Sequence, residues 1–427
     1  MGLATLAYEQ ARPFFIGEAS MTQLALVEWL VTVAWQWLAL ASVVIWLGTL
    51  LAERQLLVFC KGEQRAEVLA VLRVARQRQR RQTWLWLSAV LVGMLALLWL
   101  RLSHTLPHQQ LNTAPDWPAL ASFLVTTVEG WLWLARGALV LLGFALLTAL
   151  SVSAWRRERI EQRAGLLAGR KRSTPLPQEG AALPGGGHSE SRPLPSSLAA
   201  GTRIIPASIA VSAALLLTLV LADSGMWEGQ LPIGALALAF VALVALAAWL
   251  GKITYTAFVL IPACRAIEND ERTQALLELF QAIRPAFTQT LVALLLYGIF
   301  FVEAHLATMQ LRSFDSLFPL LQNPTGWAVL AEMCLLGGML LLASYQARRV
   351  LPHLARMAWL AARGTVATVL SGMDVSRSLE ISQDKRQELA TLAERRLLKT
   401  LAAQTVLSLL LLLCLVIAAL FAWQIVM

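Results

Sequence analysis

Long runs of apolar residues recur along the chain and are separated by shorter segments that carry most of the charge. A helix needs about 20 apolar residues to cross roughly 30 Å of hydrocarbon. The pattern therefore predicts an all-α, polytopic membrane bundle of about eight transmembrane helices. The predicted spans are residues 25–51, 83–102, 130–154, 204–222, 232–251, 287–310, 326–347 and 401–425.

The composition agrees with this pattern. Of the 427 residues, 58% are hydrophobic and 14% are charged, whereas an average soluble domain is about 45–50% apolar and about 25% charged. These figures exclude an ordinary soluble or disordered protein. The four cysteines form no C-x-x-C pair, so neither a zinc site nor a redox dithiol is indicated. Because no nucleotide-binding, metalloprotease or hydrolase motif occurs either, we do not expect an enzyme.

Nearly all of the 35 Lys and Arg residues lie in alternate loops, at 52–82, 155–203, 252–286 and 348–400. The positive-inside rule places such loops in the cytoplasm. We therefore expect a multi-pass protein of the bacterial inner (plasma) membrane with both termini extracytoplasmic. The net charge of +9 then determines topology and indicates the lipid bilayer, rather than nucleic acid, as the partner.

The chain divides into two similar halves that follow an extracytoplasmic segment at 1–24. Residues 25–222 form a first four-helix repeat with a flexible cytoplasmic linker at 155–203, and residues 232–427 form a second repeat with a cytoplasmic helical segment at 348–400. This division predicts a parallel 4+4 repeat about a pseudo-two-fold axis along the membrane normal. The motifs that recur in order are Trp46 and Gly48 with Trp249 and Gly251, and Gly130 and Trp131 with Gly326 and Trp327.

Four charged residues fall in or beside the spans and form a candidate polar cluster, namely Glu129, Arg136, Glu303 and Glu332. A charge inside a span costs several kcal/mol and calls for a partner. Since Arg136 and Glu332 occupy equivalent positions in the two repeats, we expect them to form an ion pair, with Glu129 as the rival partner of Arg136. Such a pair can fasten the two halves together without any chemical role.

Soft metal ligands also occur in the second half. His305 and Met309 lie four residues apart, on one face of the predicted sixth span, and imidazole with thioether suits Cu(I). Met333, Cys334 and Met339 of the seventh span are further candidate ligands, and His104 and His108 form a candidate outer entry for metal. Scattered Met and His residues are, however, usually packing residues in a membrane helix.

Three motifs of the second half resemble the copper-resistance D (CopD-like) family of bacterial inner-membrane proteins. They are W-L-G at 249–251 with the helix to Pro262, the stretch from Phe280 to Gly298, and the helix from Asn323 to Pro352. The resemblance implies a multi-helix protein that moves copper across the membrane beside a periplasmic copper-binding partner. The chain departs from the family at Ala39 and Ala242, where members often carry His.

Two alternatives to copper transport follow from these departures. The chain can be a metal-free structural or scaffolding subunit of a membrane complex that kept the fold. It can also be a haem b-type electron carrier, although haem is weakly indicated. A bis-His haem needs two membrane-embedded imidazoles, and His305 is placed inside a span whereas His353 follows Pro352 in a cytoplasmic segment.

Overall fold

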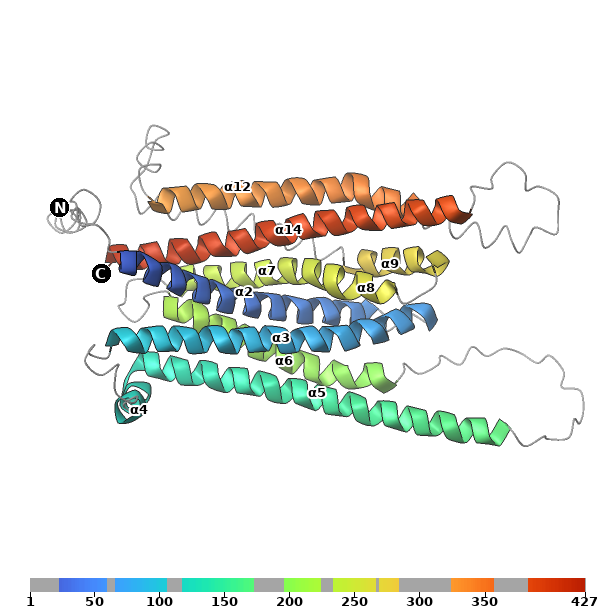
Figure 1. The fold of residues 1–427 in the computed structure, drawn as a ribbon, viewed down its shortest axis with the longest axis horizontal. Helices are drawn as coiled ribbons and strands as arrows, with labels where there is room; N and C mark the ends of the chain where they lie inside the picture. Colours follow the sequence, from blue (N-terminus) through green and yellow to red (C-terminus); the bar gives the residue numbers. More distant parts are fainter. Residues whose placement is uncertain are drawn as a thin grey trace, which may run out of the picture.

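The computed structural model describes residues 23–59, 66–105, 117–172, 196–223, 233–265, 269–283, 324–356 and 383–426, and within these ranges it contains no strand. The helices run as a bundle of long rods (Figure 1). They are α2 (Gln23–Phe59), α3 (Ala66–Thr105), α4 (Trp117–Thr126), α5 (Val128–Arg172), α6 (Ser196–Asp223), α7 (Ile233–Tyr255), α8 (Ile261–Cys264), α9 (Asn269–Ile283), α12 (Pro324–Tyr345) and α14 (Gln383–Val426), with π-helical turns η4 (Thr256–Leu260) and η6 (Gln346–Val350).

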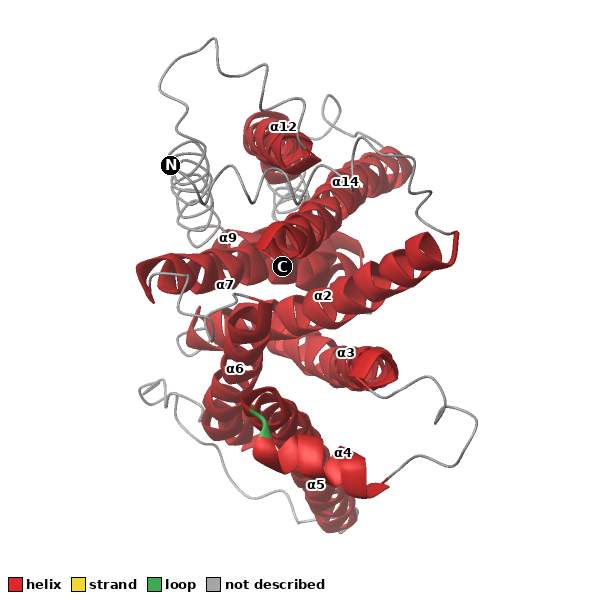
Figure 2. Cartoon of the chain, turned by 90° about the vertical axis from the view of Figure 1, so that its left-hand side faces the viewer, coloured by secondary structure: helices red, strands yellow, loops and turns green. Residues whose placement is uncertain are grey.

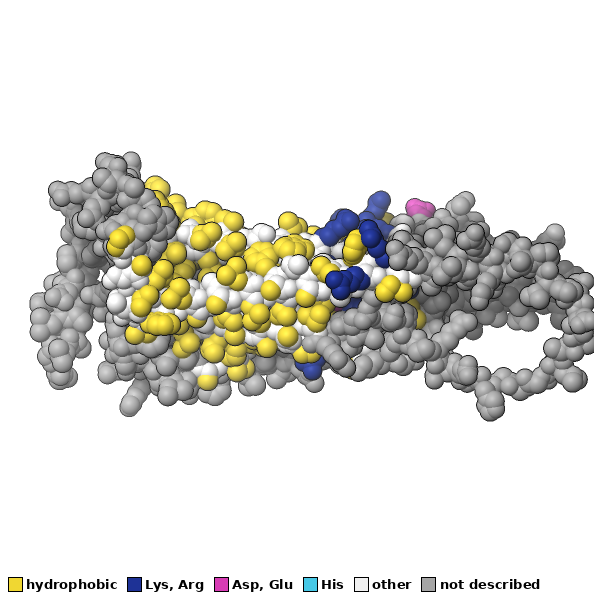
Figure 3. Space-filling view, turned by 90° about the horizontal axis from the view of Figure 1, so that it is seen from below, with side chains coloured by type: hydrophobic (Ala, Val, Ile, Leu, Met, Phe, Trp, Pro, Cys, Tyr) yellow, Lys and Arg dark blue, Asp and Glu magenta, His cyan; other side chains and the backbone are white. Residues whose placement is uncertain are grey.

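Seven of the described helices are long and apolar enough to cross a membrane, which confirms the all-α, multi-pass class. They coincide with seven of the eight predicted spans, and the remaining one, 287–310, lies outside the described residues. Helix α2 begins at the end of the bundle where α14 finishes (Figure 1). Figure 3 shows one face, on which apolar side chains cover most of the length and Lys and Arg gather near one end.

The predicted linker at 155–203 is wrong in its bounds. Helix α5 continues to Arg172, and α6 already begins at Ser196. The residues after Trp155 are mostly Arg, Glu, Gln, Leu and Ala, which are strong helix formers. The Pro- and Gly-rich composition that indicated a linker applies only to 173–195, which lie outside the described residues.

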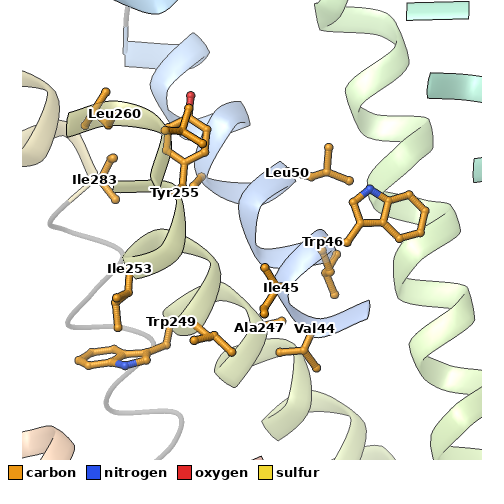
Figure 4. Packing of buried hydrophobic residues seen from close by; sticks show 14 of the residues in the cluster. Val44, Ile45, Trp46, Leu50, Ala247, Trp249, Ile253, Tyr255, Leu260 and Ile283 are labelled. Carbon is orange, nitrogen blue, oxygen red and sulfur yellow. The ribbon is translucent and has the colours of Figure 1, made fainter. Parts of the chain in front are cut away.

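The two W-L-G motifs meet at the centre of the bundle, where α2 crosses α7. A Cβ added to Gly48 would lie 1.8 Å from the Ala247 carbonyl oxygen, and one added to Gly251 would lie 2.0 Å from the Gly48 carbonyl carbon. Only glycine therefore permits this approach, as in other close helix crossings in membranes. From this crossing Trp46 and Trp249 project to opposite sides (Figure 4), and both are fully buried.

The third and fourth helices of each half form matching pairs at opposite edges of the bundle. Helix α5 packs on α6 at one edge and α12 packs on α14 at the other, with α2 and α7 between them (Figures 1 and 2). Ser212 Oγ donates to the Ser208 carbonyl at 2.9 Å, and Ser408 Oγ donates to the Gln404 carbonyl at 2.8 Å. The sequence offset between Gly130 and Gly326 also relates these two serines. The arrangement therefore supports the predicted repeat.

Two prolines cause local π-helical turns at the ends of α7 and α12. Pro262 has no N–H to give to the carbonyl of Phe258 in η4, and Gln82 Nε2 of α3 donates to that carbonyl at 3.4 Å. Pro352 follows η6 in the same way. Gln346, the first residue of η6, is buried in the bundle, where it is 3% exposed.

Candidate functional site

One face of α12 and of the adjoining η6 is buried and carries polar residues together with one methionine. Glu332, Met339 and Gln346 follow one another at seven-residue intervals, two helical turns apart, so they share this face. Met339 is fully buried, and Glu332 and Gln346 are each 3% exposed. The opposite face is apolar and exposed, as expected for contact with lipid. Its residues include Trp327, Leu330, Met333, Leu341 and Tyr345.

Helix α14 presents a matching stripe of polar residues to this face. We call the two sets together the α12–α14 interface, which consists of Glu332, Met339, Gln346, Thr400, Gln404, Ser408 and Cys414. Ser408 Oγ donates to Met339 Sδ at 3.8 Å. Gln346 Nε2 donates to Thr400 Oγ1 at 3.3 Å, and Gln404 Nε2 donates to Gln346 Oε1 at 3.2 Å. Hydrogen bonds thus link the two helices at two successive levels.

Beyond these two sets of hydrogen bonds, the α12–α14 interface contains an ionisable group, the carboxylate of Glu332. Glu332 lies seven residues before Met339 and Cys414 lies six residues after Ser408, so in the antiparallel pair of α12 and α14 both lie on the same side of the Met339–Ser408 contact. Among the described residues, the buried Oε1 atom of Glu332 has no hydrogen-bond partner. A buried carboxylate in a membrane helix is expensive, and such residues commonly mark a pathway or binding site. The level of Glu332 and Cys414 is therefore the strongest indication of function in the described part of the chain.

The equivalent interface between α5 and α6 is filled differently. Arg136 Nη2 donates to the Thr218 carbonyl at 2.7 Å, and its guanidinium lies 4.9 Å from the centre of the Trp133 ring. One repeat offset relates Arg136 to Glu332 and Thr218 to Cys414. At the next level Gly143 leaves room for the Trp46 ring, which a Cβ would approach to 2.9 Å. The two interfaces thus have the same arrangement of helices but carry different side chains at equivalent positions.

The predicted ion pair between Arg136 and Glu332 is wrong. Helices α5 and α12 lie at opposite edges of the bundle (Figure 2), and Arg136 donates to the Thr218 carbonyl of α6 instead. The prediction failed because the pseudo-two-fold axis passes through the α2–α7 crossing and holds the third helices apart. Glu129, the rival partner, lies in the first turn of α5.

The predicted metal ligands do not gather in the described part of the chain. Met333 is 44% exposed and Cys334 is exposed, so both side chains lie on the lipid face of α12 and not in the bundle. His305, Met309, Glu303 and His108 lie outside the described residues, and so does the side chain of His104. Within the described ranges, no group of three or more His, Cys, Asp or Glu could hold a metal ion.

Sequence reasoning did not identify Cys414, Ser408, Gln404 and Thr400. These residues lie in a span that is otherwise nearly continuous Leu, Ala and Val. The available signal was their spacing, because 400, 404 and 408 recur every four residues and so lie on one helix face. Polar residues on a single face of a membrane helix usually face protein or a water-filled path rather than lipid.

A second polar cluster lies at the basic end of the bundle. Glu394 of α14 is 7% exposed and accepts hydrogen bonds from Arg265 Nε at 2.8 Å and from Arg272 Nη2 of α9. Burial and the neighbouring Arg265 charge lower the pKa of Arg272. Glu53 of α2 and Arg76 of α3 form a further ion pair at 2.9 Å. These contacts join the helices where they leave the membrane.

Comparison with known proteins found no matching family model, curated protein or solved structure. The resemblance to the copper-resistance D family therefore stays a prediction. The structure does describe the position where that family often carries His. Ala39 packs so closely on α3 that a Cβ on Gly93 would lie 3.1 Å from the Ala39 Cβ. The larger imidazole ring would require α2 and α3 to separate at this position.

Proposed function

We propose that the protein moves a soft monovalent metal ion, Cu(I), across the bacterial inner membrane. The observation that carries this proposal is the α12–α14 interface, where the half-buried thiol of Cys414 and buried carboxylate, thioether and amide groups follow one another through the membrane. Thiolate and thioether ligands select Cu(I) over harder cations. The corresponding α5–α6 interface carries Gly143 beside Trp46 at the level of Met339, so the polar path belongs to the second half alone.

The donors would bind the ion one after another along the path and do not form a single chelating site. Glu332 and Met339 are seven residues apart, which is about 10 Å along a helix at roughly 1.5 Å per residue. The ion would pass from the thiol and carboxylate level of Cys414 and Glu332 to the thioether of Met339, and then to the amides of Gln346 and Gln404. Because Met339 and Gln404 are fully buried, passage requires α12 to separate from α14 locally.

The orientation is part of the same proposal. The basic residues gather at the end of the bundle that contains Glu394, and the positive-inside rule makes this end cytoplasmic. Glu332 and Cys414 are then in the outer half of the membrane, where a periplasmic copper-binding partner would deliver the ion. Both chain termini would be extracytoplasmic.

Paired cysteine and methionine variants test the transport proposal. We expect Cys414→Ser and Met339→Leu to lower the initial rate of cellular copper accumulation at least tenfold, because each removes a soft donor from the buried path. The matched controls are Cys334→Ser and Met333→Leu, which make the same changes on the lipid face of α12 and should stay within twofold of the wild type. The measurement is copper per cell by mass spectrometry, at equal protein expression.

Two outcomes of this experiment would reject the proposal. Wild-type expression that accumulates no more copper than an inactive control strain would exclude transport. Equal losses from the buried and lipid-facing variants would exclude the α12–α14 interface as the path.

His305→Ala belongs in the same series, since His305 remains a predicted ligand outside the described residues. A Soret band in the purified protein would instead support the haem alternative.

The scaffold alternative has one structural observation in its favour. Helix α5 continues from Ser153, where its membrane span ends, to Arg172, a distance of roughly 28 Å at 1.5 Å per residue. This extension, on which Ile160 is 65% exposed, gives the protein a helical surface beyond the membrane span that a partner subunit could contact. If this reading is right, Ile160→Glu will release a co-purifying subunit while copper accumulation stays unchanged.

A further inference from the structure

Exposed cations of two neighbouring helices lie at the basic end of the α12–α14 interface. The hydrogen bond from Gln346 to Thr400 holds η6 beside α14. The cations therefore lie within a few residues of this bond, on neighbouring turns of the two helices, and all are exposed. They are Arg348 and Arg349 of η6 and Arg395, Arg396 and Lys399 of α14, which we call the η6–α14 basic cluster.

The described residues supply no carboxylate to neutralise this cluster. No Asp or Glu occurs between Glu332 and Arg356. The nearest acid on α14, Glu394, is buried and already pairs with Arg265 and Arg272. Because each surface cation attracts anionic headgroups by about 1 kcal/mol, several such cations on adjoining turns form a strong local attraction for phosphate.

Apolar surface adjoins the η6–α14 basic cluster on the membrane side. Leu341 lies seven residues before Arg348 on α12 and is 73% exposed, and Val406 lies seven residues after Lys399 on α14 and is 55% exposed. Tyr345, 49% exposed, lies at the border, as aromatic residues of the interfacial belt do. A bound molecule would therefore contact cations with one end and apolar side chains with the other.

Four of the five cations of the cluster are specific to the second repeat, whereas Lys399 corresponds to Arg203. At the equivalent positions the first repeat has Val152 and Ser153 in place of Arg348 and Arg349. It has Ala199 and Ala200 in place of Arg395 and Arg396. A general preference for positive charge in cytoplasmic loops would not require one repeat to have arginines where the other has uncharged residues.

We propose that the η6–α14 basic cluster binds one anionic phospholipid that carries two phosphates, as cardiolipin does. Two phosphates match cations contributed by two adjacent helices, and the acyl chains lie along the exposed apolar faces of α12 and α14. This lipid would hold η6 against α14 at the basic end of the interface. The inference does not depend on copper transport, and its test does not involve copper.

Native mass spectrometry of the full-length protein in detergent tests this site. We titrate wild type with cardiolipin, with phosphatidylglycerol and with phosphatidylcholine, and expect cardiolipin to bind at least tenfold more tightly than either of the others. Replacing the four arginines of the cluster with glutamine should weaken cardiolipin binding at least tenfold. The matched control removes the same charge from exposed arginines of α3 and α5, namely Arg73, Arg78, Arg156 and Arg159, and should change binding less than twofold.

Three results would overturn the proposal. Equal losses in both fourfold variants would show that only net charge matters. Equal binding of cardiolipin and phosphatidylglycerol would exclude a two-phosphate site. Displacement of cardiolipin by inorganic phosphate at an equal concentration of phosphorus would identify a site for free phosphate instead. If the fourfold variant does not fold, Arg348→Gln with Arg349→Gln carries the same test, with an expected loss of at least threefold.

Discussion

Replacing Gly48 with alanine is expected to destabilise the bundle by about 3 kcal/mol, because the added methyl group would overlap backbone atoms of α7. Its Cβ would lie 1.8 Å from the Ala247 carbonyl oxygen and 2.7 Å from the Gly251 Cα. Backbone atoms cannot rotate away as a flexible side chain can, so the two central helices must move apart along a packed interface. Reversible unfolding in mixed detergent micelles measures the free-energy change, and Gly251→Ala should give a similar loss.

The control for this prediction is another glycine inside a membrane helix. A Cβ added to Gly137 of α5 meets no atom within 4 Å. Alanine is favoured over glycine in a helix by up to about 1 kcal/mol, so Gly137→Ala should leave the stability unchanged or raise it. If Gly48→Ala and Gly137→Ala behave alike, the α2–α7 crossing is not as close as described here.

The second large effect is expected from Glu394→Gln at the basic end of the bundle. This change removes the carboxylate that Arg265 and Arg272 share and leaves Arg272, whose side chain is 17% exposed, without its counter-charge. Removing one partner of a buried ion pair typically costs 3–5 kcal/mol. Because Arg265 is half exposed and can turn to water, we expect a loss of about 3 kcal/mol in the same unfolding assay.

Glu388→Gln provides the comparison on the same helix. Glu388 is exposed, and surface substitutions of this kind usually change stability by less than about 0.5 kcal/mol. The difference between the two variants measures the Arg265–Glu394–Arg272 cluster rather than the loss of one negative charge from α14. A destabilisation by Glu394→Gln no larger than that by Glu388→Gln would contradict a structural role for the cluster.

The membrane spans could be predicted from the sequence because hydrocarbon requires a minimum length of apolar helix. The W-L-G motifs also predicted that the chain repeats, and the contact of Gly48 with Gly251 at equivalent positions supports this prediction. Neither signal specifies which helices become neighbours. The pairing of Arg136 with Glu332 therefore failed, although their equivalence was read correctly.

The rotation of each helix about its axis was harder to predict. A soluble helix shows its buried face by amphipathicity, but a membrane helix is apolar on both its lipid and its protein faces. The sequence signal that favours Met339 over Met333 as the residue inside the bundle is therefore indirect, namely that only Met339 shares a helix face with Glu332 and Gln346. The hydrogen bonds from Ser408, Gln346 and Gln404 provide that information, and they depend on the register of α14 against α12.

The glycine crossing restricts how the two copies of the repeat can diverge. Gly48 and Gly251 contact each other, so a side chain gained by either copy must be accommodated by the other, and neither position can drift alone. The third helices carry no such mutual restraint, because α5 and α12 lie at opposite edges of the bundle. Opposite charges at Arg136 and Glu332 could therefore arise independently. The centre is thus restrained to stay symmetric, while the edges are free to differ.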